Sequence, residues 1–211
     1  MPLFGPPNVE KLKRKRDVKG LLKALGHKDP AIRLNAENAL NELGTAAVEP
    51  LIDAALYAWN ANVREAAMEA LRKLGTAALI ARLEDEDAGV RGATALALGQ
   101  LKDTGAVEPL IAALEDDEAG VCVAVALALG ELGDARGVEP LIAALEDEDE
   151  GVRAAAAAAL GELKDARAVE PLFAALDGDD EVVASAAAAA LERISGPELE
   201  RALEEYRQRR T

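Results

Sequence analysis

Apolar residues recur at helical spacing in short blocks, and acidic residues separate the blocks. In the clearest block, Leu141 and Leu145 are four residues apart, which places them on one side of a helix predicted from about 138 to 145. A second helix is predicted from about 151 to 163, after the acidic residues 146–150. The pattern therefore predicts two amphipathic helices joined by a short acidic connection.

The same helix pair recurs along most of the chain. The motif Val-Glu-Pro-Leu occurs four times, and its last three copies are 31 residues apart. Proline suits the first turn of a helix, where its missing N–H costs no hydrogen bond. Matching segments extend the series to six copies, whose anchor leucines are Leu21, Leu51, Leu79, Leu110, Leu141 and Leu172. One helix pair cannot bury both of its apolar faces, so a stack of six pairs is predicted.

Short-range signals mark the ends of the second helices. Asp149 is placed to cap the second helix of the fifth pair, and the acidic residues before it complement the positive end of the helix dipole. Gly44, Gly75 and Gly133 closely follow second helices, where a left-handed residue commonly ends a helix.

The repeat divides the chain into three parts. We expect a basic N-terminal cap segment over residues 1–16, a solenoid over residues 17–196 and a C-terminal cap helix over residues 197–211. A stack of repeats needs polar or atypical ends, and both ends of this chain are rich in charged residues. The six units are expected at about 17–44, 45–75, 76–102, 103–133, 134–164 and 165–195.

The repeated segments resemble a known family. Val-Glu-Pro-Leu-Ile, then Glu-Asp-Glu-Asp before Val-Arg, then Ala-Leu-Gly-Glu-Leu, are similar to HEAT-like repeats, most closely to the short form named after phycobilisome lyases. The resemblance covers about 17 to 195 and implies an all-α fold, a right-handed α-α superhelix of six helix pairs plus the C-terminal cap helix. Most proteins of this kind are binding scaffolds. Some are subunits of bilin lyases, and one metal-dependent hydroxylase family is built from similar units.

The resemblance also assigns a role to one repeated arginine. Ladder arginines in the family pair with acidic residues of neighbouring units, and the matching positions here are Arg33, Arg64, Arg91 and Arg153. Cys122 and Ala184 occupy this position in units four and six, so we expect the ladder to be interrupted there.

Composition and charge narrow the choice of fold and of partner further. Aromatic residues are only 2% of the chain although 50% is hydrophobic, so the core must consist of Leu, Val and Ala, which favours close-packed helices over a β-sandwich. The net charge is −15, with +6 in residues 1–28 and −21 in residues 29–196. The acidic body disfavours nucleic acid as a partner. We interpret the basic stretch 11–16 as part of the cap, with binding to anionic lipid or nucleic acid as the alternative.

Signals for location are few. No apolar run is long enough to span a membrane, and residues 1–8 lack the apolar stretch of a signal peptide. A single cysteine, Cys122, excludes an internal disulfide. We therefore expect a cytoplasmic protein.

The sequence offers little for catalysis. A hydroxylase on this scaffold would need several His-Glu pairs, whereas His27 is the single histidine, and neither a catalytic triad nor a phosphate-binding loop is present. We expect no catalytic residue, no cofactor and no metal, and we interpret Cys122 as a small buried residue. The acidic connections are interpreted as helix caps that aid solubility, with a cation site or a ridge for a basic partner as the alternative.

The outer positions of the second helices carry the functional hypothesis. The resemblance places these helices on the concave surface, where periodicity predicts polar residues, yet the middle units carry Leu96, Val123 and Leu127. An exposed apolar floor with a charged rim commonly marks an interaction surface. The predicted partner-binding residues are Leu34, Asn38, Glu69, Leu96, Gln100, Val123, Leu127, Glu131, Ala155, Ala158, Glu162 and Arg193. The alternative is that these side chains pack on one another in a tightly curved solenoid.

The sequence thus predicts a non-enzymatic scaffold that binds a partner helix, a peptide or a second copy of the chain. The alternative is an accessory or chaperone-like subunit related to bilin lyases, which the family resemblance alone suggests.

Overall fold

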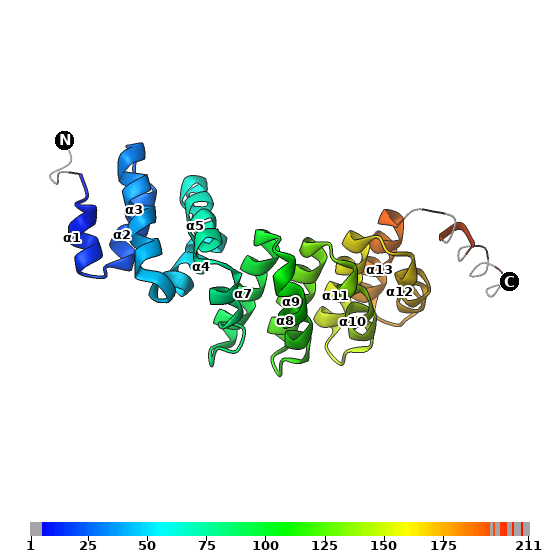
Figure 1. Ribbon diagram of the computed structural model, residues 1–211. Coiled ribbons are helices and arrows are strands. Elements are labelled where there is room, and N and C mark those ends of the chain that lie inside the picture. The colour runs from blue at the N-terminus through cyan, green and yellow to red at the C-terminus, as the bar shows by residue number, and fades with distance from the viewer. Residues whose placement is uncertain (1–5, 195, 197–198, 202–203, 205–207, 209–211) are drawn as a thin grey trace. The chain divides into compact units, whose positions relative to one another are not determined.

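The computed structural model describes residues 6–194, 196, 199–201, 204 and 208. Throughout these residues the regular structure is helical and contains no strand (Figure 1). The prediction of an all-α fold built from helix pairs is confirmed for these residues. The predicted C-terminal cap helix over 197–211 lies for most of its length outside the described residues.

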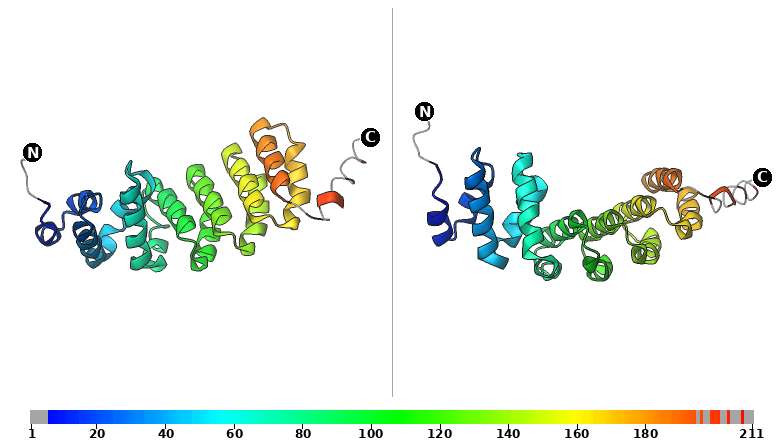
Figure 2. Two further views of the ribbon diagram at one scale, coloured as in Figure 1. Left: turned by 90° about the horizontal axis from the view of Figure 1, so that it is seen from above. Right: turned by 45° about the horizontal axis from the view of Figure 1, so that its top comes forward.

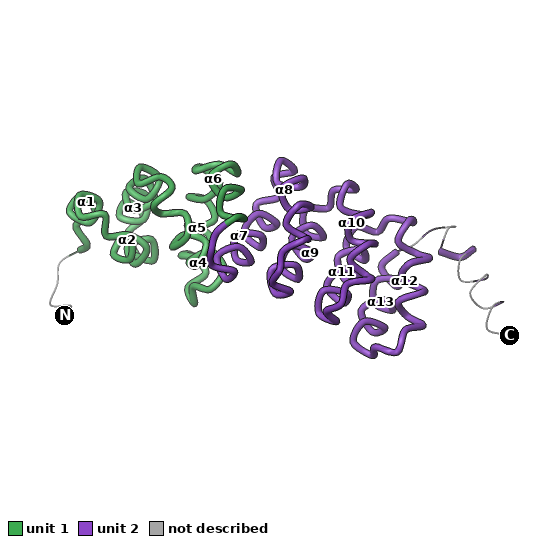
Figure 3. The backbone as a smooth tube through the Cα atoms, turned by 90° about the horizontal axis from the view of Figure 1, so that it is seen from below, with its two compact units in different colours: residues 1–84 green, residues 85–211 purple. Residues whose placement is uncertain are grey.

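The chain forms two compact units, residues 1–84 and 85–211 (Figure 3). The division falls between the two helices of the third predicted repeat. Each unit is described by itself below.

The first unit contains two helix pairs, the first helix of a third pair and a short N-terminal helix. Its elements are α1 (Val9–Arg14), α2 (Val18–Leu25), α3 (Pro30–Leu43), α4 (Val48–Tyr57), α5 (Ala61–Leu74) and α6 (Thr76–Ile80). Helix α1 packs against α2 and α3, buries Val9, and forms an ion pair from Lys13 to Glu42 of α3. The basic N-terminal segment therefore contacts the first helix pair through both apolar and charged groups.

The second unit is a two-layered stack. One layer contains the long helices α7 (Ala88–Leu101), α9 (Ala119–Leu132), α11 (Glu150–Leu163) and α13 (Glu181–Arg193), each of which packs against the next. The other contains the shorter helices α8 (Val107–Ala112), α10 (Val138–Ala143) and α12 (Val169–Leu176) (Figure 2). The sequence predicts α10 to reach residue 145, but its last turn tightens into a 3-10 helix over Ala144–Glu146.

The repeat predicts the core correctly. All six anchor leucines, one in each first helix, have no exposed surface: Leu21, Leu51, Leu79, Leu110, Leu141 and Leu172. These leucines recur every 28 to 31 positions because each helix pair contributes one such buried position.

Helix starts follow the prediction more closely than helix ends. The Asp149 carboxylate accepts hydrogen bonds from the backbone N–H groups of Gly151 and Val152, as expected for a cap. Gly133 ends α9 in the left-handed conformation, whereas Gly44 and Gly75 have positive φ but lie outside that region. Lysines rather than glycines take the left-handed position after α7 and α11, at Lys102 (φ 55°) and Lys164 (φ 53°).

Glycine has a different role inside the long helices. A Cβ atom added at Gly99, Gly130 or Gly161 would lie 2.8, 2.9 or 2.7 Å from the Cα atom of an alanine in the next long helix. These alanines are Ala128, Ala159 and Ala190. The second unit therefore stacks its long helices through glycine-to-alanine contacts, which explains why this part of the chain is poor in large side chains.

The corresponding position of α5 is occupied by Arg72, in the sequence Ala-Leu-Arg where α7, α9 and α11 have Ala-Leu-Gly.

Candidate protein-interaction surface

The predicted apolar cluster lies on the outer face of α7 and α9. Val123 and Leu127 are one helical turn apart on α9, and Leu96 takes the position on α7 that Leu127 takes on α9. The side chain of Leu127 is 41% exposed, and Leu96 and Val123 are half-buried. These side chains contribute apolar surface outside the core.

Small residues continue this face across the next helix. Ala158 of α11 is half-buried, whereas Ala155 is only 7% exposed and belongs to the core. The inclusion of Ala155 among the surface residues was therefore wrong, because its side chain turns toward the packed side of α11. Gly92 of α7, opposite Ala124 of α9, adds no side chain to the face.

Polar residues border the face where the long helices end. Gln100, Glu131, Glu162 and Arg193 are all exposed, as the sequence predicts. Arg193 of α13 pairs with Glu162 of α11 across 3.6 Å, which joins two of the predicted residues directly. Exposed pairs of this kind contribute little stability, so this rim remains available for other charges.

The other predicted residues belong to the first unit. Leu34 of α3 is 55% exposed and Asn38 is exposed. Glu69 of α5 is half-buried and accepts a hydrogen bond from Arg72 at 2.6 Å. Nine of the twelve predicted residues therefore belong to the second unit and three to the first.

The arginine ladder connects consecutive pairs in the second unit. Arg91 of α7 donates two hydrogen bonds to the Asp116 carboxylate, at 2.6 and 2.7 Å, and a third to the carbonyl oxygen of Asp85 at 2.8 Å. Arg153 of α11 reaches Asp180 at 2.8 Å in the same way. Hydrogen bonding to the Arg91 guanidinium lowers the pKa of the Asp116 carboxyl. The pairing that the family resemblance implies is confirmed for these two arginines.

In the first unit the ladder arginines bind backbone carbonyls. Arg33 donates to the carbonyl oxygens of His27 and Lys28 at 2.9 and 3.1 Å, and Arg64 donates to that of Ala58 at 2.7 Å. Each of these bonds holds the connection before the long helix against the start of that helix.

A second arginine network was missed from the sequence. Arg136 binds Asp134 at 2.9 Å and Glu108 of the preceding pair at 3.2 Å, and Arg167 repeats the arrangement one unit later. Hydrogen bonding to Arg136 lowers the pKa of Asp134 to about 2. The repeated Asp-Ala-Arg, 31 residues apart, was the available signal, but the sequence does not reveal which glutamate the arginine reaches.

The acidic connections serve mainly as helix caps. The Asp87, Asp149 and Asp180 carboxylates accept hydrogen bonds from backbone N–H groups at the starts of α7, α11 and α13. No cluster suited to hold a metal ion is found in the part of the chain that the structure describes.

Cys122 fills the ladder position of α9. Its side chain is buried, and its Sγ lies 3.1 and 3.2 Å from the carbonyl oxygens of Asp116 and Leu114. Burial, with the negative charges of Asp116 and Asp147, raises the pKa of the thiol. These surroundings disfavour a reactive thiolate, which agrees with the interpretation of Cys122 as a small buried residue.

Replacing Cys122 by Arg is expected to raise the urea midpoint of unfolding. The new guanidinium would occupy the position of Arg91 and reach Asp147, which corresponds to Asp116 one unit later. Urea unfolding followed by circular dichroism measures the change. The gain should disappear when Asp147→Asn is added to Cys122→Arg, and a lower midpoint for the single variant would contradict the expectation.

Comparisons with known proteins agree with the geometry. The family model for HEAT repeats matches residues 9–72, 49–128, 76–143, 121–192 and 138–209. No curated protein matches the sequence significantly.

None of the helices among the described residues is long and apolar enough to cross a membrane.

Several solved structures are similar to this chain. An engineered protein is 25% identical, with a TM-score of 0.53 over 84% of this chain and 96% of its own. Human deoxyhypusine hydroxylase is 23% identical, with a TM-score of 0.52 over 88% of this chain and 76% of its own. The CpcE–CpcF complex of phycocyanin lyase from Nostoc sp. PCC7120 is 24% identical, with a TM-score of 0.43 over 90% of this chain and 94% of that chain.

Proposed function

The chain belongs to the HEAT-repeat family, and we propose that it is a non-enzymatic scaffold that binds a helix or peptide of a partner protein, or a second copy of itself. The proposed binding surface is the outer face of α7 and α9. The observation that carries the proposal is the cluster of Leu96, Val123 and Leu127, which contributes apolar surface where helical periodicity predicts polar residues.

The face is suited to receive apolar side chains from a partner. Covering apolar surface stabilises a complex by roughly 25 cal/mol per Å², before the cost of association is subtracted. Gly92 and Ala158 flank the leucines with little side-chain bulk, so a partner can approach the helices closely. Glu131 and Glu162 at the rim favour a partner whose flanking residues are basic.

Enzymatic alternatives have less support. The accessory role related to bilin lyases rests on the family resemblance alone. A metal-dependent hydroxylase on this scaffold would need several histidine and glutamate ligands, and His27 is the single histidine of the chain. The proposal therefore assigns binding and no reaction.

The double variant Leu96→Glu, Leu127→Glu tests the proposal. Both substitutions lie at outer positions, so helicity by circular dichroism should remain that of the wild type, while two carboxylates would oppose apolar association. Self-association is measured by sedimentation equilibrium, and partner capture by affinity purification from the native host with mass spectrometry. We expect the double variant to lose the association that the wild type shows.

Val182→Glu is the matched control, because Val182 is also an exposed apolar residue of a long helix, at 56% exposure, but lies at the start of α13. The control should associate like the wild type. Undiminished association of the folded double variant would refute the proposed surface.

A further inference from the structure

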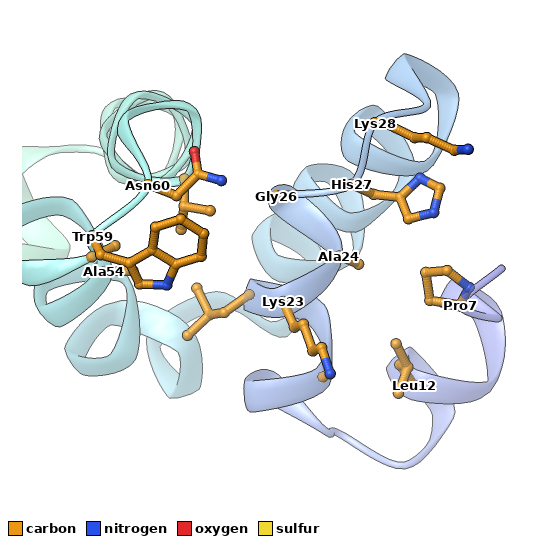
Figure 4. Close-up of a pocket in the computed structure, with 14 residues that line it drawn as sticks. Pro7, Leu12, Lys23, Ala24, Gly26, His27, Lys28, Ala54, Trp59 and Asn60 are labelled. Atoms are coloured by element: carbon orange, nitrogen blue, oxygen red, sulfur yellow. The ribbon is translucent and has the colours of Figure 1, made fainter. Parts of the chain in front are cut away.

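A large groove lies within the first compact unit, around α2. Its volume is about 1030 Å³. Figure 4 shows Trp59 and Asn60, from the connection between α4 and α5, on one side and Pro7 and Leu12 on the other, with α2 between them. None of its fourteen lining residues belongs to the face of α7 and α9. The groove is therefore separate from the surface proposed above.

The floor of the groove is apolar. Leu12, Leu22, Ala54 and Val63 contribute to its lining. Trp59 stands beside them with 92% of its surface exposed, the most exposed of the large hydrophobic side chains in the described residues. An indole that remains in water offers a partner a large rigid apolar surface at low entropic cost.

The charges of the groove are opposite to those of the chain as a whole. Its lining includes the cationic Lys23 and Lys28 and contains no acidic residue, although the chain has 39 acidic and 24 basic residues. Lys23 and Lys28 are exposed, and within the described residues no ion pair is formed by either ammonium group. Two unpaired cations beside an apolar floor are complementary to carboxylates that flank an apolar side chain.

We propose that this groove binds an acidic segment of a partner protein, with an apolar side chain placed against Trp59 and carboxylates placed near Lys23 and Lys28. A nucleic acid would also meet cations and a stacking surface. It is disfavoured because residues 29–196 carry a net charge of −21, which repels an extended polyanion more than a short peptide.

Trp59 supplies a direct measurement, because it is the only tryptophan of the chain. The probe is the acetylated and amidated peptide Glu-Glu-Leu-Glu-Glu-Leu-Glu-Glu, titrated into the full chain. Burial of the indole should shift its emission to the blue in a saturable manner, and added salt should weaken the binding. The same peptide with lysine for glutamate, and the same peptide with serine for leucine, should bind far more weakly.

The variant pair separates this proposal from nonspecific attraction. Lys23→Glu with Lys28→Glu should weaken binding of the acidic peptide by about tenfold or more, as expected when two attractive contacts become repulsive. Lys15→Glu with Lys19→Glu makes the same change of charge at two exposed lysines outside the lining, and should leave the affinity nearly unchanged. Circular dichroism verifies that both variants fold.

Several results would overturn the proposal. These are the absence of a saturable emission shift, equal loss of affinity in both lysine pairs, and tighter binding of oligothymidylate than of the acidic peptide. Self-association of the free chain that the Lys23→Glu, Lys28→Glu pair abolishes would assign the groove to a second copy instead. None of these measurements involves Leu96 or Leu127, so the two proposals can fail independently.

Discussion

Replacing Leu141 by Ala is expected to lower the free energy of unfolding of the second compact unit by about 2–5 kcal/mol. Leu141 lies in α10 and has no exposed surface. The substitution removes buried methyl groups and leaves a cavity between helices that are tightly packed and collapse only partly. Urea unfolding followed by circular dichroism measures the loss.

Leu127→Ala is the matched control, since it removes the same atoms from a side chain that is 41% exposed. Its effect should be clearly smaller, because fewer contacts are lost and alanine favours the helix. Equal losses for Leu127→Ala and Leu141→Ala would mean that the anchor position is not the core of the pair.

Gly130→Ala is expected to destabilise the second unit by about 1–3 kcal/mol, although alanine is the better helix former. The added Cβ atom would lie 2.9 Å from the Cα atom and 3.0 Å from the Cβ atom of Ala159. Since the nearest obstacle is backbone, the two helices α9 and α11 have to move apart. Thermal and urea unfolding both measure the change.

Gly120→Ala provides a control of opposite sign in the same helix. Nothing lies within 4 Å of a Cβ atom added at Gly120, so the substitution should be neutral or stabilise the helix by up to about 1 kcal/mol. A stabilising effect at Gly130 would show that α9 and α11 do not approach as closely as described.

The glycine contacts and the proposed binding face are linked through the long helices. Gly99 lies on the side of α7 that meets Ala128 of α9, and the outer side of the same two helices carries Leu96 and Leu127. The two leucines therefore lie on helices that pack closely against each other.

The sequence by itself determined the helix pairs, their acidic caps and their buried leucines. Leu141 was identified as a core residue from its spacing, and Asp149 as a cap from its place before α11. Both are local signals, because helical periodicity and capping depend on residues within a few positions of one another. Because the units repeat, each conclusion also applied to the equivalent residues of the other units.

The tertiary structure alone decided which residues from different repeats meet. Gly130 against Ala159 and Arg136 against Glu108 are contacts between residues far apart in the sequence, and Trp59 and Lys23 line one groove from different helix pairs. The tertiary structure also placed Ala155 in the core, although the sequence predicted it on the outer face. It divided the chain into two compact units after residue 84. Such features depend on how closely and at what angle the helices pack, and side-chain spacing within a single helix carries no information about either.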